Sequence, residues 1–129
     1  MADTLIPKDL KYTNTHEWLK IEGDIAIVGI TDYAQKELSD IVYVELPETG
    51  KVIKQGDVLG TIEAVKAVSD FYSPVSGTVI ASNNELKNAP DLVNKDPYGK
   101  GWMVKIQLTD PSEITSLLDS DQYEKNISG

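Results

Sequence analysis

Residues 58–79 read VLGTIEAVKAVSDFYSPVSGTV, a largely apolar stretch with a single lysine, Lys66. β-Branched and aromatic residues on both sides of Lys66 predict two short strands that pair as a hairpin with the lysine at its tip. The segment 62–69 contains no Gly, Asn, Asp or Pro, the residues that most often make tight turns. Ala64 and Ala67 are small, so the amine of Lys66 is predicted to be open on the surface.

The same alternation of short strands and turn residues runs along the rest of the chain. Strands are predicted at about 12–19, 25–30, 41–46, 58–63, 68–72, 77–81 and 102–108. Such a series is typical of a sandwich or small barrel, and the first two strands are predicted to form a hairpin. Thr31 is predicted to cap a short helix that ends near Leu38, and the polar segment 83–98 to form a loop with one helical turn. Gly77 is predicted to permit a tight turn.

The C-terminal region carries the signature of a helix start. Asp110 is followed by a proline and then, three residues after the cap, by Glu113, which is the pattern of a capping box. The apolar residues that follow share one helical face, which is predicted to pack on the β-structure. We therefore predict a helix over about 111–123 and fraying over 124–129.

The composition is that of a globular protein, with 129 residues, 40% hydrophobic and 26% charged. Residues 1–129 are predicted to form a single domain with one core. No apolar run approaches the roughly 20 residues needed to span a bilayer, so membrane insertion is not expected. The first ten residues, MADTLIPKDL, have neither a signal-peptide nor a transit-peptide pattern. These features predict a cytoplasmic protein or, in a eukaryote, a mature mitochondrial matrix chain without its presequence.

The charge and the cysteine count exclude several classes of function. Twelve basic and 21 acidic side chains leave a formal net charge of −9, which repels phosphate backbones, so no nucleic-acid partner is expected. The acidity either serves solubility alone or also steers the protein toward complementary partners. With no cysteine there is no disulfide and no thiol nucleophile, so any sulfur chemistry must be imported. His16 is the only histidine, and no metal site is predicted.

The residues alone leave two interpretations of Lys66. A strand lysine ordinarily lays its methylenes on apolar neighbours while its ammonium stays in water. A projecting lysine with small neighbours is also a good acylation target, because its amine can reach into an enzyme's pocket. The amide that forms then removes the charge.

Several motifs together resemble the H proteins of the glycine cleavage system. They are YTNTHEWL, GITDYAQKELSDIVYVELPETG, IEAVKAVSDFYSPVSGTV and LVNKDPYGKGWMVKI, in this order along about residues 8–108. The resemblance implies a mainly β fold, a flattened barrel-sandwich hybrid of the lipoyl- and biotinyl-carrier type, with a short internal helix and a C-terminal helix. It also implies that Lys66 carries lipoic acid as an amide, which supplies the missing sulfur. The HEW and DPYGKGW motifs, and the absence of methionines beside the lysine, favour this family over 2-oxoacid dehydrogenase lipoyl domains and biotinyl domains.

By this resemblance the chain is a non-catalytic, monomeric carrier in glycine catabolism and one-carbon metabolism. It would take the aminomethyl group of glycine from the pyridoxal-phosphate-dependent glycine decarboxylase to the tetrahydrofolate-dependent aminomethyltransferase. Dihydrolipoyl dehydrogenase would reoxidise the swinging arm, and a lipoylating enzyme would attach it. A lipoyl relay, in which the chain donates lipoyl groups to other carrier domains, stays open as an alternative, as does an unmodified scaffold.

The resemblance also suggests a cleft that protects the carried group. Thr15, Glu17 and Asp70 are candidates to hold its ammonium, because carboxylates and hydroxyls accept charge-assisted hydrogen bonds. The alternative is that Glu17 and Asp70 are solvated surface acids. Glu63, three residues before Lys66, is a candidate for recognition by the lipoylating enzyme or for pairing with the amine.

The chain departs from the family pattern at two positions. Ala64 stands where the family usually has serine, and Ser39 stands where it often has glycine. Neither adjoins the lysine, but Ala64 puts in question how efficiently a lipoylating enzyme recognises the hairpin.

Overall fold

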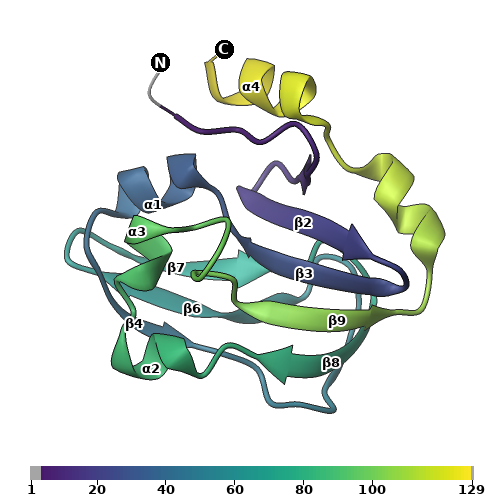
Figure 1. Cartoon of the computed structure of the whole chain (residues 1–129), viewed down its shortest axis with the longest axis horizontal. Coiled ribbons are helices and arrows are strands. Elements are labelled where there is room, and N and C mark those ends of the chain that lie inside the picture. The colour runs from purple at the N-terminus through teal and green to yellow at the C-terminus, as the bar shows by residue number, and fades with distance from the viewer. Residues whose placement is uncertain (1–3, 129) are drawn as a thin grey trace.

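Two antiparallel β-sheets form the body of this computed structural model, which describes residues 4–128 (Figure 1). The strands are β1 (Lys11–Tyr12), β2 (Glu17–Glu22), β3 (Ile25–Ile30), β4 (Ile41–Glu45), β5 (Val52–Ile53), β6 (Val58–Ala64), β7 (Val68–Tyr72), β8 (Gly77–Ser82) and β9 (Val104–Leu108). The large sheet has the order β1-β2-β3-β9-β8-β5, and the small sheet has the order β4-β6-β7. The mainly β fold class is confirmed, and the two sheets do not close into one barrel.

The core lies between the two sheets, because side chains alternate between the faces of each strand. In the small sheet, Val44 of β4 and Ile62 of β6 are paired in register and both are buried. They belong to one apolar cluster with Phe71 of β7 and with Val28 and Ile106 of the large sheet. Burial of such surface, at about 25 cal/mol per Å², is the main term that holds the sheets together. On the opposite face of the small sheet, Tyr43, Glu63 and Val68 are exposed.

The first hairpin forms between β2 and β3 as predicted, but the predicted strand over 12–19 is wrong. The chain turns back after Tyr12, so that β1 pairs antiparallel with β2 instead of continuing into it. His16, the last residue of this turn, has a left-handed backbone conformation with φ 73°. The turn over residues 13–16 contributes side chains to the candidate site described below.

Gly77 is the first residue of β8, where it is paired with Ile53 and Leu108, and it does not lie in a tight turn, so the prediction for this glycine is wrong. A Cβ added at Gly77 would lie 2.0 Å from the backbone oxygen of Gln107 on β9. The two residues belong to strands that are paired in register, so neither backbone is free to move aside. Glycine is required here by the close approach of two backbones.

Short helices lie at the ends of the sheets. They are α1 (Asp32–Leu38), α2 (Glu85–Asn88), α3 (Leu92–Lys95), the 3₁₀ helix η1 (Pro111–Ser116) and α4 (Ser120–Ser128). Thr31 caps α1 as predicted, since its Oγ1 accepts a hydrogen bond of 3.2 Å from the N–H of Ala34. The segment 83–98 contains two short helices, where one helical turn was predicted. None of the helices in the described part of the chain is long and apolar enough to cross a membrane.

The C-terminal region is divided, and the prediction of one helix over 111–123 is wrong. The 3₁₀ helix η1 ends at Ser116 and α4 begins only at Ser120. Between them, Leu118 and Tyr12 exchange two backbone hydrogen bonds of 2.8 Å. This pairing extends the large sheet and interrupts the helix. Residues 124–128, predicted to fray, belong to α4, and Gly129 lies outside the described residues.

The expected capping box at the start of η1 is only half formed. Asp110 caps the helix by accepting a hydrogen bond of 3.1 Å from the N–H of Ser112. Glu113 instead accepts hydrogen bonds from the backbone N–H and the hydroxyl of Ser76, at 2.6 and 2.7 Å. A tertiary contact to the loop before β8 therefore replaces the local one that the sequence pattern predicts.

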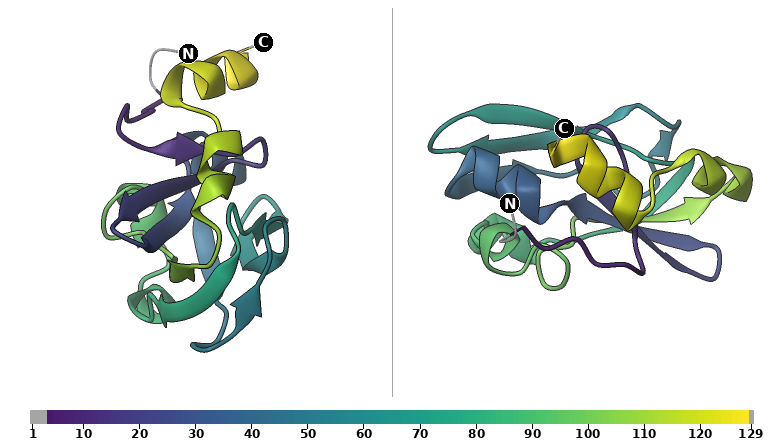
Figure 2. Two further views of the ribbon diagram at one scale, coloured as in Figure 1. Left: turned by 90° about the vertical axis from the view of Figure 1, so that its right-hand side faces the viewer. Right: turned by 90° about the horizontal axis from the view of Figure 1, so that it is seen from above.

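The helix α4 packs on a small second core. The rings of Tyr123 and Tyr12 are stacked, with centroids 4.7 Å apart and an interplanar angle of 9°, and they cluster with Trp18 and Leu10. The hydroxyls of Tyr123 and Thr31 are hydrogen bonded at 2.7 Å, which joins α4 to the start of α1. Figure 2 shows α4 lying beside the N-terminal segment at one end of the molecule.

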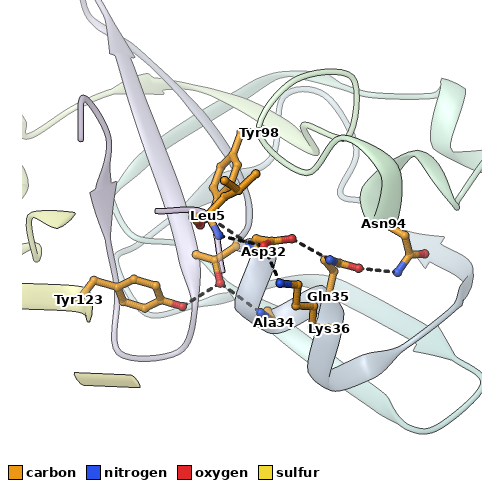
Figure 3. A network of polar contacts seen from close by, with 9 residues as sticks. Leu5, Asp32, Ala34, Gln35, Lys36, Asn94, Tyr98 and Tyr123 are labelled. Carbon is orange, nitrogen blue, oxygen red and sulfur yellow. Dashed lines mark hydrogen bonds and ion pairs between the residues drawn. The ribbon is translucent and has the colours of Figure 1, made fainter. Parts of the chain in front are cut away.

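A network of polar contacts holds α1 in place (Figure 3). Asp32 accepts hydrogen bonds from the N–H of Leu5 at 3.0 Å and from the side-chain amide of Gln35 at 2.8 Å. Gln35 in turn accepts a hydrogen bond of 2.9 Å from Asn94, which connects α1 to α3. Burial opposes ionisation of Asp32, but these donors and the ammonium of Lys36 hold its pKa below the ordinary value. The network fixes the helix whose side chains border the candidate site.

Candidate functional site

Lys66 lies at the tip of the β6–β7 hairpin, as predicted. The N–H of Ala64 donates a hydrogen bond of 2.8 Å to the carbonyl of Ala67, which closes the tip. The N–H of Val65 donates to the carbonyl of Asp40 at 2.9 Å, which attaches the tip to the segment before β4. The hairpin projects at one edge of the molecule (Figures 1 and 2). The side chain of Lys66 is exposed. Its amine is therefore accessible to another protein.

Glu63 and Ala64 point to opposite faces of β6. Glu63 is exposed on the outward face, and within residues 4–128 no ion pair joins it to Lys66. The structure therefore does not show the ion pair between Glu63 and the amine of Lys66. The other role suggested for Glu63, recognition by the lipoylating enzyme, stays a prediction. Ala64 is paired with the buried Ile41 and faces the core side. Ala64, which stands where the family usually has serine, therefore changes the side of the hairpin tip that faces the core and not the exposed side.

A cleft of about 250 Å³ lies between β7, α1 and the turn before β2. It is lined by Thr15, His16, Glu17, Ile30, Tyr33, Ala34, Glu37, Leu38, Ile62, Ser69, Asp70 and Phe71. The three predicted cleft residues, Thr15, Glu17 and Asp70, therefore meet at one place although they come from different sheets. Polar groups from the turn and from β7 face apolar side chains of α1 and the core.

Glu17 is almost fully buried at the start of β2, so it is not a solvated surface acid. Its Oε1 accepts hydrogen bonds from the hydroxyls of Thr13, at 2.6 Å, and Thr15. Its Oε2 accepts a hydrogen bond of 3.0 Å from the N–H of Tyr72 on β7. Burial raises the pKa of Glu17 above its ordinary value, although these hydrogen bonds act in the opposite direction. The carboxylate is thus oriented by three donors before any ligand arrives.

Asp70 borders the same cleft from the outer edge of β7. Its Oδ1 accepts a hydrogen bond of 3.1 Å from the hydroxyl of Thr61, and the strand register places both residues on the outward face of the small sheet. Asp70 and Thr15 are both exposed. Asp70 therefore remains in contact with water, and its role in the cleft stays a prediction.

Sequence reasoning missed Thr13, which shares the carboxylate oxygen of Glu17 with Thr15. The hydroxyl of Thr13 also accepts a hydrogen bond of 3.1 Å from the N–H of Glu17, so both the side chain and the backbone of Glu17 are held. The alternation of Thr13, Thr15 and Glu17 was the signal that could have identified it. Glu37 of α1 was also missed, because no local pattern places this helix beside β7.

His16 forms part of the cleft wall and connects it to α4. Its Nδ1 lies 2.9 Å from the hydroxyl of Tyr123, and its ring contacts Tyr33 with centroids 4.9 Å apart. Burial lowers the pKa of His16, while the carboxylate of Glu37 acts in the opposite direction. These contacts give the histidine a structural role.

A second cavity, of about 380 Å³, lies on the other side of Glu17. It is lined by residues of the β1–β2 turn, by Tyr72 and the residues after it, and by the end of η1. Thr15 and Glu17 line both cavities. The carboxylate of Glu17 therefore stands at the boundary between them.

The chain is similar over most of its length to proteins of one family. The family model described as Glycine cleavage H-protein matches residues 10–129. The glycine cleavage system H protein of Carboxydothermus hydrogenoformans is 53% identical over 122 residues, which cover 95% of this chain and 94% of that protein. The corresponding protein of Staphylococcus haemolyticus is 52% identical over 122 residues, covering 95% of this chain and 97% of that protein.

The fold agrees with a solved structure of the same family. The crystal structure of a glycine cleavage system H protein from Mycobacterium marinum has a TM-score of 0.88 and 36% sequence identity to this chain. The match covers 96% of this chain and 100% of that one. Sequence and structure therefore agree on one assignment: the chain belongs to the glycine cleavage H-protein family.

Proposed function

We propose that this chain carries a lipoyl group in amide linkage to Lys66 and works as the swinging arm of the glycine cleavage system. It receives the aminomethyl group of glycine from the decarboxylase and presents it to the aminomethyltransferase, and dihydrolipoyl dehydrogenase then reoxidises the arm. The observation that carries the proposal is the exposed lysine at the tip of a projecting hairpin, in a chain of this family. The chain itself acts as a monomeric, non-catalytic carrier in the cytoplasm or the mitochondrial matrix.

The surroundings of Lys66 fit the attachment of an acyl group. The neutral amine of Lys66 attacks the carbonyl carbon of a lipoyl group activated as an acyl adenylate. A C–N bond forms, the acyl–oxygen bond breaks, AMP leaves and the nitrogen loses a proton. The apolar neighbours Val65 and Ala67 suit an uncharged amide better than an ammonium. When bound, the lipoyl ring supplies the sulfur that this cysteine-free chain lacks.

The length of the arm agrees with the position of the cleft. The lysine side chain and a lipoyl group together span on the order of a dozen bonds and reach about 12 to 15 Å. Asp70 is four residues after Lys66, and a fully extended chain rises about 3.3 Å per residue, so the two residues lie at most about 13 Å apart. An arm folded back along this strand therefore ends at the level of Asp70, beside the cleft.

In this proposal Glu17, inside the cleft, and Asp70, at its outer edge, hold the ammonium of the carried aminomethyl group. Glu17 is oriented by its three donors, so accepting a cation requires little rearrangement. A cation in the cleft favours the ionised form of Glu17 and offsets the effect of burial on its pKa. The rings of Tyr33 and Phe71 line the same cleft and limit the access of water to the carried group.

Intact mass spectrometry tests the attachment site. Incubation of the chain with a lipoylating enzyme, ATP and lipoate is expected to add one lipoyl-sized mass increment. The increment is expected to vanish in Lys66→Ala and to remain in Lys51→Ala, an exposed lysine elsewhere on the surface. An unmodified wild-type chain would show that the carrier proposal is wrong and would leave the scaffold alternative.

Reconstitution with the decarboxylase separates glycine cleavage from the lipoyl relay. The lipoylated chain is expected to support exchange between the carboxyl group of glycine and bicarbonate. A fully lipoylated chain that supports no exchange, but donates lipoyl groups to other carrier domains, would favour the relay.

The rate of aminomethyl release tests the cleft. Glu17→Gln and Asp70→Asn remove the two negative charges with little change of shape, so release from the loaded chain in buffer is expected to accelerate about tenfold in the double variant. Glu63→Gln, which removes a charge outside the cleft, is the control. An unchanged release rate in the double variant would show that these carboxylates do not hold the group.

A further inference from the structure

We propose that the exposed apolar side chains beside Lys66 form the docking surface for the enzyme that attaches the lipoyl group. The four residues are Val42 and Tyr43 of β4, Val65 at the hairpin tip and Val68 of β7, and they are called the tip patch below. The inference rests on the proposed function and identifies the surface through which Lys66 is recognised. The partner is expected to present an apolar surface with basic side chains at its rim.

The strand register places the tip patch around Glu63 on the outward face of the small sheet. Tyr43 of β4 and Val68 of β7 are the two cross-strand partners of Glu63. The next register row along the strands, which contains Val44 and Ile62, faces the core and is buried. Tyr43, Glu63 and Val68 therefore form one continuous row of exposed side chains on the outward face of the small sheet.

Within residues 4–128, these side chains stay largely exposed to solvent. The exposed fractions are 55% for Val42, 48% for Tyr43, 73% for Val65 and 67% for Val68. Val42 sits at the register shift between Ile41 and Tyr43, which turns an additional apolar side chain outward. Single exposed apolar residues are ordinary on protein surfaces, but a group gathered around one reactive side chain marks an interaction site.

The charges around the tip patch define the chemistry of the partner. Asp40, Glu45, Glu63 and Asp70 lie in or beside the strands that carry it, and all four are exposed. Lys66 is the only basic residue between positions 55 and 86. An acidic rim around an apolar centre complements a basic rim around an apolar surface and accelerates encounter between the two proteins.

The position of the Lys66 amine indicates that the enzyme which attaches the lipoyl group is the protein that docks on the tip patch. This enzyme must bring its activated acyl group within bonding distance of the amine of Lys66, so it works directly beside the exposed side chains of the tip. An enzyme that acts on the far end of the arm works about 12 to 15 Å beyond the lysine backbone and has no such requirement. Of the enzymes expected to act on this protein, the attaching enzyme is therefore the one whose reaction takes place nearest the tip patch.

Lipoylation kinetics of the unmodified chain test the proposal. The double variant Tyr43→Ser/Val68→Ser is expected to lower kcat/KM for lipoylation about tenfold, mainly through KM, with a purified lipoylating enzyme, ATP and lipoate. Val52→Ser is the matched control, since Val52 is 74% exposed but lies on β5 of the other sheet. Glu63→Gln is expected to lower kcat/KM less and to weaken its dependence on salt concentration.

A second readout separates docking from general damage to the protein. Each variant is lipoylated to completion with excess enzyme. Its reduction by dihydrolipoyl dehydrogenase with NADH as the electron donor, which is the reverse of the reoxidation step, is expected to match that of the wild type. Thermal unfolding of the double variant is expected to stay close to that of Val52→Ser. Equal lipoylation kinetics in the wild type and the double variant, or an equal loss in Val52→Ser, would overturn the tip patch alone. A wild-type chain that is never lipoylated would overturn the proposed function, and the docking surface with it.

Discussion

The backbone N–H of Tyr72 donates a hydrogen bond of 3.0 Å to the buried carboxylate of Glu17. Glu17 begins β2 in the large sheet, and Tyr72 ends β7, an edge strand of the small sheet. The carboxylate of Glu17 therefore accepts a hydrogen bond from the edge of the small sheet. The hydroxyls of Thr13 and Thr15, which precede β2 of the large sheet, hold the same carboxylate in place. This bridge between the sheets lies in the cleft that we assign to the carried group.

The raised pKa of Glu17 predicts a pH-dependent effect of Glu17→Gln on stability. Because burial raises the folded-state pKa above the ordinary 4.5, the protonated form stabilises the fold at low pH. The contribution of protonated Glu17 to the free energy of unfolding is fully present below the unfolded-state pKa of Glu17. It is lost as the pH rises through the folded-state pKa of Glu17. Glutamine cannot ionise, so the variant's free energy of unfolding is expected to improve relative to the wild type as the pH rises.

Urea unfolding at a series of pH values from about 4 to about 8 measures this difference. Glu63→Gln, at an exposed position, serves as the matched control. A difference between Glu17→Gln and wild type that is constant over the whole range would contradict the assigned pKa shift.

Ser39 ends α1 with φ 65° and ψ −148°, a region that only glycine adopts without strain. Ser39→Gly is therefore expected to raise the free energy of unfolding by about 1 kcal/mol, although glycine also makes the unfolded chain more flexible. Ser39→Ala keeps the backbone strain and is expected to give no gain. Equal stability of the two variants in urea would show that this backbone conformation carries no strain.

Gly77→Ala is expected to lower the free energy of unfolding by about 2–3 kcal/mol, because the added Cβ would overlap the carbonyl of Gln107. Thr78→Ala, at the neighbouring position of β8, is the control for a change of strand propensity. Thermal unfolding compares the two variants. A loss in Gly77→Ala no larger than that of the control would mean that β8 and β9 can separate without cost.

Tyr123→Phe removes the hydroxyl that contacts His16 and Thr31 but keeps the ring stacked on Tyr12. The expected loss of stability is about 1–2 kcal/mol, as for hydrogen bonds removed from a buried site. Tyr123→Ala also removes the packing and is expected to cost about 3–5 kcal/mol. If the two substitutions cost the same in urea unfolding, the ring contributes nothing and the attachment of α4 is entirely polar.

Several features of this protein follow from local sequence patterns. The hairpin around Lys66, the β2–β3 hairpin and the cap at Thr31 were predicted correctly, because strand alternation and capping depend on residues that are neighbours in the chain. The motifs around the lysine also predicted the family, which the comparisons confirm. Thr15 and Glu17 were selected from one such motif.

Tertiary contacts decided the rest. The break in the C-terminal helix arises because Leu118 pairs with Tyr12 in the large sheet, and the capping box fails because Glu113 binds Ser76. The environment of Glu17 required β7 from the other sheet, whose Tyr72 supplies the third hydrogen bond. Local propensity is worth a few tenths of a kcal/mol per residue, so one long-range pairing or buried contact is enough to override it.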